Sequence, residues 1–155
     1  MPDAIEMLEA DHREVEGLFA ALEDLSGIER QQTLNKLAKS LSIHAQIEEE
    51  VLYPAMKGGG LDDEVKEATE EHQKVKDLVA QLEEVDPSSD VDALVAELKA
   101  DVTRHVHEEE TEVFPKFRDA VDQEKLDELA LALVEARESA MQTQEPRQSR
   151  TSEVD

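Results

Sequence analysis

The sequence predicts an all-α protein: an up-down-up-down four-helix bundle made of a duplicated helical hairpin, followed by a short C-terminal helix and a disordered tail. Three observations favour this fold class. Segments rich in Leu, Ala, Glu and Lys carry apolar residues every three or four positions, which is helical periodicity. Turn-forming stretches separate these segments. The first half of the chain also resembles the second half, with a repeat of two units.

The apolar periodicity and the turn signals give the bounds of each element. Helices are expected at residues 3–25, 29–57, 62–85, 90–119 and 123–141. Asp3, Asp62 and Asp90 are the expected N-caps, because a carboxylate there accepts hydrogen bonds from the free amides of the first turn. The end of the chain has no apolar period, so residues 1–141 are predicted to form one domain and 142–155 a disordered tail.

The internal repeat aligns histidines with histidines. The segment "HREVEGLFAALEDL" (12–25) aligns with "HQKVKDLVAQLEEV" (72–85) at a shift of 60. The segment "HAQIEEEVLYP" (44–54) aligns with "HVHEEETEVFP" (105–115) at a shift of 61. The two hairpins are therefore expected to pack with approximate two-fold symmetry.

Composition excludes several classes of function. The chain has 16 basic and 40 acidic residues, a formal net charge of -24, which disfavours nucleic acid and anionic membranes as partners. It has no cysteine, so disulfides, thiolate ligands and thiol nucleophiles are excluded. No apolar run approaches a membrane span and the N-terminus is acidic, so a cytoplasmic protein is expected. The acidity is also compatible with a high-salt cytoplasm.

Six polar side chains interrupt the apolar stripes where core residues belong. His44 and Glu48, like His105 and Glu109, are four residues apart and project from one helical face, while His12 and His72 occupy mid-helix positions. Burying an unpaired carboxylate in such a stripe would cost roughly several kcal/mol of folding free energy. Each glutamate should therefore be protonated, paired or bound to metal. Four imidazoles and two carboxylates at one level of a bundle suit two iron or manganese ions, and zinc is a further candidate.

Other interpretations of these polar residues are less consistent with the sequence. A single H-x-x-x-E pair is mostly structural, but repeat equivalence favours a site. His107 lies about 200° around the helix from His105 and is predicted to be a surface residue. The remaining acidic neighbours are predicted to be solvated charges: Glu49, Glu50, Glu108, Glu110 and Glu112. A ferritin-type site needs Glu-x-x-His on two helices, and only Glu9 and His12 have that spacing.

The order His, H-x-x-x-E, His, H-x-x-x-E, with an aromatic residue and proline after each pair, resembles the haemerythrin-like (HHE cation-binding) domain family over residues 3–120. The resemblance implies a non-haem di-iron centre. It implies that one iron is bound by His12 and His44, that the other is bound by His72 and His105, and that the bridges are Glu48 and Glu109.

The chain departs from the oxygen-carrying members in two ways. Lys76 stands where they have a second histidine on the third helix, and the last His–Glu spacing is four rather than five. Lys76 is interpreted either as a donor to a bound anion or as a side chain that points outward. Phe19, Tyr53 and Phe114 are interpreted as core packing, and Pro54 and Pro115 as sites where each helix bends or ends.

The expected function is binding of, or reaction with, O2, peroxide or nitric oxide, in oxidative or nitrosative stress defence or sensing. A slow catalase-like or peroxidase-like activity is one form of it. The alternative is an iron-sensing or iron-handling module in which metal occupancy stabilises the fold. A small diatomic or peroxide ligand is the only partner that the sequence indicates.

Overall fold

A computed structural model of the chain describes residues 1–86 and 90–144. All regular elements within these residues are helical: α1 (Ala4–Asp24), α2 (Gly27–Ile47), η1 (Glu48–Leu52), α3 (Tyr53–Gly58), α4 (Asp62–Glu84), α5 (Asp92–Glu108), η2 (Glu109–Val113), α6 (Phe114–Ala120) and α7 (Gln123–Gln144). The predicted all-α class is confirmed. The predicted C-terminal helix exists, but at 22 residues it is one residue longer than α1, because its periodicity continues to Gln144. The rest of the predicted tail lies outside the described residues.

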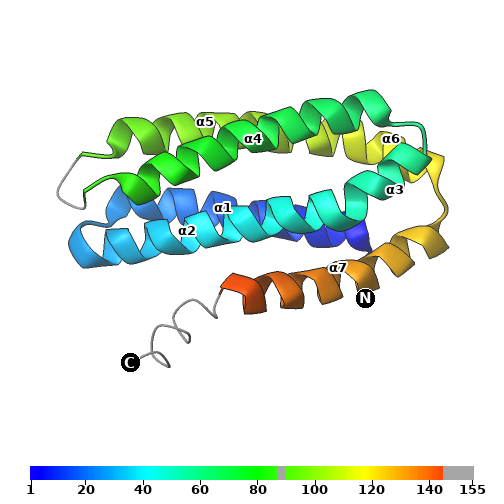
Figure 1. Ribbon diagram of the computed structural model, residues 1–155, viewed down its shortest axis with the longest axis horizontal. Helices are drawn as coiled ribbons and strands as arrows, with labels where there is room; N and C mark the ends of the chain where they lie inside the picture. Colours follow the sequence, from blue (N-terminus) through cyan, green and yellow to red (C-terminus); the bar gives the residue numbers. More distant parts are fainter. Residues whose placement is uncertain (87–89, 145–155) are drawn as a thin grey trace.

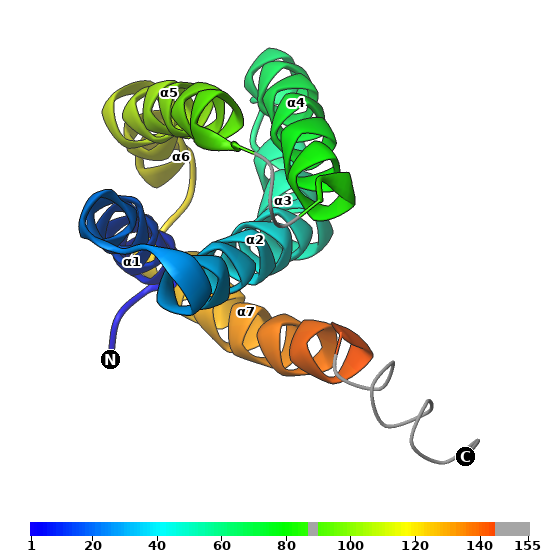
Figure 2. The same cartoon turned by 90° about the vertical axis from the view of Figure 1, so that its left-hand side faces the viewer.

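The helices form two layers and an appended element. The α1–α2 pair lies against the α4–α5 pair, and α3 and α6 are at the same end of the bundle (Figure 1). Viewed along the bundle, α7 lies outside the four-helix arrangement (Figure 2), and it packs against α1, α2 and η1. None of the helices within the described ranges is long and apolar enough to cross a membrane.

The helices predicted at 29–57 and 90–119 each contain a π-helical turn that begins at the expected ligand glutamate, Glu48 or Glu109. The amide of Tyr53 donates to the carbonyl of Glu48, and the amide of Phe114 donates to the carbonyl of Glu109, five residues earlier in each case. The prolines that follow lack an amide hydrogen, so the local α-helical hydrogen-bond ladder is broken there. The expectation that these prolines disturb their helices is confirmed, but the helix widens before the proline and then continues.

Only one of the three predicted N-caps is correct. Asp3 caps α1 in a reciprocal arrangement with Glu6, each side chain bonding the other residue's backbone amide. The residue before α4 is Leu61, so Asp62 is the first helical residue rather than the cap. The residue before α5 is Val91, so Asp90 is not the cap. The Asp90 side chain nevertheless accepts a hydrogen bond from the backbone amide of Asp92, two residues later. An aspartate near a helix start therefore stabilises the first turn from more than one position.

Two apolar clusters fill the interior, and the four buried histidines and two buried glutamates lie between them. One cluster includes Phe114, Phe117, Leu8 and the α7 residues Leu126 and Leu133. The other fills the opposite end of the bundle and is centred on Leu37, Leu98 and Phe19. Its other buried members are Val15, Leu22, Leu34, Leu41, Val75, Leu78, Val79, Val102 and Val106. Fully burying one such large side chain stabilises the fold by about 1.5–3 kcal/mol. Helix α7 thus completes the core at one end.

Candidate metal centre

The structure brings the six predicted ligand residues together in the interior of the bundle. His12 comes from α1, His44 from α2, His72 from α4 and His105 from α5, while Glu48 and Glu109 come from the two π-turns. All six side chains are buried. His107, by contrast, is exposed, as the sequence predicts. The register on α5 is therefore the predicted one.

The six residues divide into two groups that share both glutamates. In the His12 group, one donor atom from each of His12, His44, Glu48 and Glu109 lies within 4.8 Å of the others. In the His72 group, the same holds for His72, His105, Glu48 and Glu109. Two histidines on each side of a shared carboxylate pair is the arrangement of a two-metal site.

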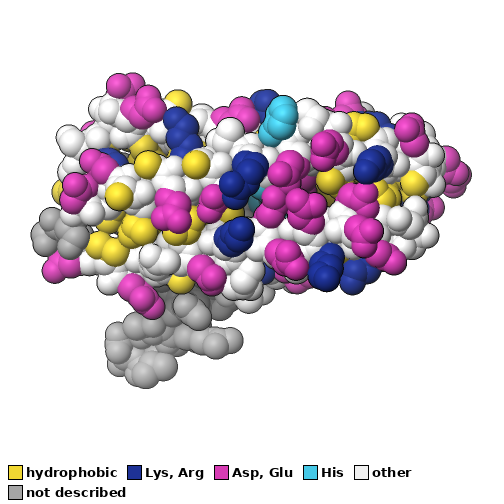
Figure 3. Space-filling view, turned by 90° about the horizontal axis from the view of Figure 1, so that it is seen from above, with side chains coloured by type: hydrophobic (Ala, Val, Ile, Leu, Met, Phe, Trp, Pro, Cys, Tyr) yellow, Lys and Arg dark blue, Asp and Glu magenta, His cyan; other side chains and the backbone are white. Residues whose placement is uncertain are grey.

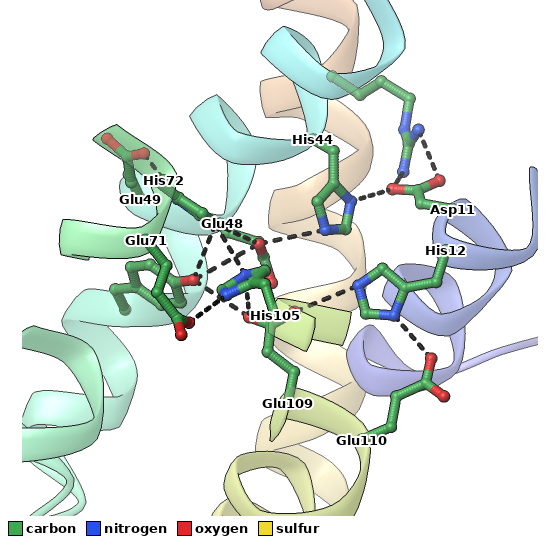
Figure 4. A network of polar contacts seen from close by, with 12 residues as sticks. Asp11, His12, His44, Glu48, Glu49, Glu71, His72, His105, Glu109 and Glu110 are labelled. Atoms are coloured by element: carbon green, nitrogen blue, oxygen red, sulfur yellow. Dashed lines mark hydrogen bonds and ion pairs between the residues drawn. The ribbon is translucent and has the colours of Figure 1, made fainter. Parts of the chain in front are cut away.

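A carboxylate holds the outer nitrogen of each histidine (Figure 4). The Nδ1 atom of His12 lies 2.6 Å from Glu110 and that of His72 lies 2.8 Å from Glu49. The Nδ1 atom of His44 lies 2.9 Å from Asp11 and that of His105 lies 2.6 Å from Glu71. A histidine that donates Nδ1–H to a carboxylate has its tautomer and ring orientation fixed, and its Nε2 lone pair is free to bind a metal.

These contacts correct the sequence interpretation of two glutamates. Glu49 and Glu110 were predicted to be solvated charges, but each is only partly exposed and each receives a hydrogen bond from a buried histidine. The two carboxylates are repeat-equivalent, at a shift of 61, and Asp11 and Glu71 are repeat-equivalent at a shift of 60. This equivalence is the sequence signal that could have indicated the carboxylate partners of the histidines. An acidic residue precedes the histidine on α1 and α4, and another follows each predicted ligand glutamate.

Basic side chains pair with three of these four carboxylates. Arg13 forms an ion pair with Glu110, Arg137 contacts Asp11 through two hydrogen bonds, and the Nζ atom of Lys76 lies 3.0 Å from Glu49. Lys76 is 43% exposed and points to the surface. Of the two interpretations of Lys76, the outward one is therefore correct, and its partner is the carboxylate that holds His72.

The fourth carboxylate has an acidic neighbour. Glu71 hydrogen-bonds with Glu108, and that hydrogen bond together with burial raises the pKa of Glu108 to about 7. Glu108, predicted to be a solvated charge, is instead partly buried and hydrogen-bonds with Glu71. Glu50 and Glu112 are exposed, as predicted.

Tyr53 is buried in the core cluster around the site, as predicted, and its hydroxyl group also makes polar contacts within the centre. Its oxygen lies 3.1 Å from Glu109 Oε2 and 3.1 Å from His72 Nε2. Burial, together with Glu109 and Glu48, raises the pKa of Tyr53 well above its ordinary value, so the hydroxyl stays protonated and donates. On a regular α-helix, the side chain of Tyr53 would point about 140° away from that of Glu48, which is five residues earlier. The π-turn η1 between them reduces this angle and turns Tyr53 toward the predicted ligands.

Phe114, the repeat equivalent of Tyr53, makes a different kind of contact with the His12 group. Phe114 stacks on the ring of His12 at a centroid distance of 6.0 Å and offers no polar atom. Phe19 is buried in the apolar cluster at the other end of the bundle. Core packing is thus confirmed for Phe114 and Phe19, and Tyr53 makes the two groups chemically unlike.

The electrostatics of the centre show how strongly the histidines and glutamates interact. Burial alone lowers the pKa of His44, but Glu48 and Asp11 outweigh it and raise that pKa to about 10. The pKa values of His72 and His105 also rise against the effect of burial, because Glu48 and Glu109 face them. Burial raises the pKa of Glu109, but His105 and His12 lower it well below its usual range. The lowered pKa of Glu109 keeps this carboxylate charged, and its charge favours a cation beside it.

Unsatisfied atoms provide a test of whether a metal fits. Within the described residues, four buried side-chain atoms have no hydrogen-bond partner: His12 Nε2, His44 Nε2, Glu48 Oε2 and Glu109 Oε1. His12 Nε2 and Glu109 Oε1 are 3.2 Å apart but lack hydrogen-bond alignment. A buried polar atom left unsatisfied costs about 1–3 kcal/mol. All four belong to the predicted ligands, and imidazole and carboxylate donors suit iron, manganese or zinc, so the residues fit a metal pair.

A small apolar cavity of about 30 Å³ adjoins the four histidines. Apart from these rings it is lined by Val15, Leu41, Ala45, Val75, Val102 and Val106. One water molecule occupies about 30 Å³ in the liquid. The cavity therefore has room for a molecule of two or three atoms next to the metal-binding nitrogens.

Comparison with known proteins agrees with this geometry. A curated relative from Nostoc sp. described as a DNA nickase is 27% identical over 139 residues. That match covers 88% of this chain and 40% of the relative, so the chain spans about two fifths of the relative's length. The crystal structure of a Hemerythrin HHE cation binding domain-containing protein, the Mycobacterium kansasii homologue of Rv2633c, has the same fold. It matches with a TM-score of 0.81 and 24% identity, over 92% of this chain and 90% of that one.

The profile of the family described as the Hemerythrin HHE cation binding domain matches residues 3–117. This range contains the six predicted ligand residues and ends before α7. The chain therefore belongs to the haemerythrin HHE cation-binding domain family.

Proposed function

We propose that this protein holds a non-haem di-iron centre that binds or reacts with O2, peroxide or nitric oxide, in oxidative or nitrosative stress defence or sensing. The observation that carries the proposal is the set of four inward-facing Nε2 atoms around two buried, shared glutamates. Each Nδ1 atom is already held by a carboxylate, so the Nε2 atoms are oriented for binding before a metal arrives. Bound iron would supply a Lewis acid and a redox couple.

The cavity supports a small ligand. Its volume of about 30 Å³ is far below the roughly 300–1,000 Å³ of typical pockets for organic molecules. Its walls apart from the histidines are aliphatic, so a charged organic substrate would lose hydration without gaining polar partners. O2 and nitric oxide are small and nearly apolar, and peroxide is small enough to enter.

The protein residues around the cavity have distinct roles in this proposal. Valine and leucine side chains exclude bulk water from the histidine side of the centre. Glu48 and Glu109 place negative charge between the two groups. Tyr53 holds its proton at a hydroxyl oxygen 3.1 Å from Glu109, where it can donate to Glu109 or to a ligand that displaces this contact. Tyr53 gives the His72 group a proton donor that the His12 group lacks. This asymmetry favours reaction of a bound ligand over its reversible storage.

DNA cleavage does not follow from the similarity to the nickase. The match covers 40% of that protein, and a formal net charge of -24 repels a phosphate backbone. Acidic side chains are spread over the face formed by α4 and α5, with lysine and arginine interspersed (Figure 3). We therefore expect no nucleic acid and no anionic membrane among the partners, and a cytoplasmic location.

A second candidate function is an iron-sensing or iron-handling module without catalysis. It is favoured by the burial of both glutamates and all four histidines, because metal binding then contributes directly to the stability of the fold. A fold whose stability depends on iron can report the concentration of iron. The two candidates differ in whether the loaded centre reacts with oxidants.

One experiment tests the proposal and separates the candidates. The protein is titrated with Fe²⁺ without oxygen and then exposed separately to O2, peroxide and nitric oxide while its optical spectrum is recorded. Binding of two iron ions followed by a spectral change with at least one oxidant or with nitric oxide is the expected result. Iron binding with no change supports the sensing module. A protein that binds no iron contradicts both.

A further inference from the structure

We propose that Arg137 of α7, outside the family-matched range, is a positioning residue for the metal centre: it fixes Asp11 and, through Asp11, the ring of His44. The inference rests on the proposed function, because it concerns the orientation of a metal ligand. Arg137 lies 20 residues beyond the last matched position, 117, on the helix that packs outside the four-helix bundle.

The contact between Arg137 and Asp11 is bidentate. Nη1 donates to Oδ1 at 3.0 Å and Nη2 donates to Oδ2 at 2.9 Å. Two parallel hydrogen bonds fix the plane of a carboxylate, which a single lysine contact does not do. Asp11 is 13% exposed and Arg137 is 30% exposed, so the pair is partly shielded from water.

Asp11 in turn holds His44. Its Oδ2 atom accepts from His44 Nδ1 at 2.9 Å, while His44 Nε2 faces the centre and is one of the unsatisfied atoms there. A fixed carboxylate therefore orients the ring that presents this nitrogen to the metal. Without Arg137, Asp11 could rotate toward solvent, and the hydrogen bond that sets the ring's tautomer would weaken.

Helix α7 packs against α1, α2 and η1, so it can act as the anchor for this chain of contacts. Leu126, Leu129, Leu133 and Ala140 are buried in the same apolar cluster as residues of α1 and α2. By linkage, if docking of α7 strengthens metal binding, then metal binding strengthens docking of α7 by the same factor. Occupancy of an interior site would thereby be communicated to the C-terminal helix.

The test compares Arg137→Met, Arg137→Lys and a matched control, Arg118→Met. Arg118 makes an equivalent bidentate pair with Asp3, at 3.0 and 3.3 Å, and this pair contacts no ligand histidine. Anaerobic Fe²⁺ and Co²⁺ titrations give the affinity of each metal equivalent. Proton NMR of the cobalt form gives the solvent exchange rate of each histidine Nδ1–H, which a purely structural role of Arg137 would leave unchanged.

Arg137→Met should weaken one of the two metal equivalents about threefold to tenfold, less than the 10–100-fold typical of losing a direct partner of a ligand. In Arg137→Met, one Nδ1–H should exchange faster, and the α7 amides should lose their metal-dependent protection from hydrogen exchange. Arg137→Lys should recover part of the metal affinity and part of the slow Nδ1–H exchange. Arg118→Met should show none of these changes. If Arg137→Met binds both metals as wild type does, or binds one more tightly, the inference is wrong. If wild type itself binds no metal, the proposed function fails instead.

Discussion

His12 and Glu110 form a 2.6 Å hydrogen bond across the bundle although 98 residues separate them in the sequence. The repeat-equivalent pair, His72 and Glu49, forms the same contact at 2.8 Å. In each case the histidine of one hairpin is held by a carboxylate of the other hairpin. The orientation of the metal-binding nitrogens therefore depends on the two halves being packed together.

Removal of individual ligands should lower metal content. Alanine at position 12, 44, 72 or 105, or at position 48 or 109, removes one donor from a buried group. We expect two iron ions per wild-type chain and lower occupancy in each variant, measured by metal analysis after anaerobic loading. His107→Ala is the control, because that side chain is exposed. A centre emptied by His107→Ala but not by His105→Ala would contradict the assignment.

Loss of a carboxylate that holds a histidine should weaken metal binding without removing a ligand. Glu110→Gln and Glu49→Gln replace the partners of His12 and His72 with neutral amides of the same shape. The expected loss of metal affinity is about 10–100-fold, as for other partners of ligand histidines. Glu50→Gln is the matched control, since Glu50 is adjacent to Glu49 but exposed. Equal affinities in Glu49→Gln and Glu50→Gln would show that the contact is incidental.

The pH dependence of stability should differ between metal-free and metal-bound protein. The folded-state pKa of His44 is raised from 6.5 to about 10, so its contribution to metal-free stability is complete below pH 6.5 and is lost as pH rises toward about 10. Metal binding requires the neutral ring and strengthens over the same range. The difference in Tm with and without Zn²⁺, a redox-inert probe, should therefore widen as pH rises. A constant difference across this range would contradict the assignment of His44 as a ligand.

Tyr53→Phe should separate metal binding from reactivity. The hydroxyl donates to Glu109, and position 114 of the other half already carries a phenylalanine. We expect both metal ions to remain bound, while the reaction with peroxide slows by about 100-fold, a common effect of losing a positioned proton donor. Stopped-flow optical measurements on the iron-loaded protein give the rate. An unchanged rate at full occupancy would assign Tyr53 to packing alone.

Low ionic strength should destabilise the fold. With a formal net charge of -24, the folded chain repels itself, and the screening length is about 30 Å at 0.01 M salt but about 8 Å at 0.15 M. Tm should therefore rise with NaCl in metal-free and metal-bound protein alike. Sucrose at matched osmolality is the control for effects that do not depend on charge. A Tm independent of NaCl would remove the argument for a protein adapted to high salt.

The clustering of the six candidate ligands was predictable from the sequence, because the repeat aligned the four histidines and two glutamates with one another. Their carboxylate partners were harder to find, because 40 of 155 residues are acidic and a glutamate beside a ligand is unremarkable in such a chain. Helical periodicity also assumes 3.6 residues per turn, whereas the π-turns after Ile47 and Glu108 change that angle. The direction of the Tyr53 hydroxyl follows from the π-turn and was therefore not predictable from α-helical spacing.

Helix α7 was predictable as an element but not as a contributor to the site. Its apolar face indicates that it packs against the bundle, and the buried residues Leu126 and Leu133 agree. The hydrogen bonds between Arg137 and Asp11 join positions 126 residues apart, and nothing in the repeat indicates them, because α7 has no counterpart in the first half. Long-range partners of this kind depend on how the helix docks.

The exchange of carboxylates between the two hairpins has an implication for ancestry. A single hairpin carries two histidines, one shared glutamate and one carboxylate that reaches across, so two identical hairpins around a two-fold axis would supply every contact of the centre. The chain thus has the geometry of a fused homodimer. Identical subunits must offer both metal ions the same surroundings. Fusion removes that constraint, and the two halves of this chain differ: Tyr53 contacts His72, Phe114 stacks on His12, and Arg137, beyond the second hairpin, bonds with Asp11.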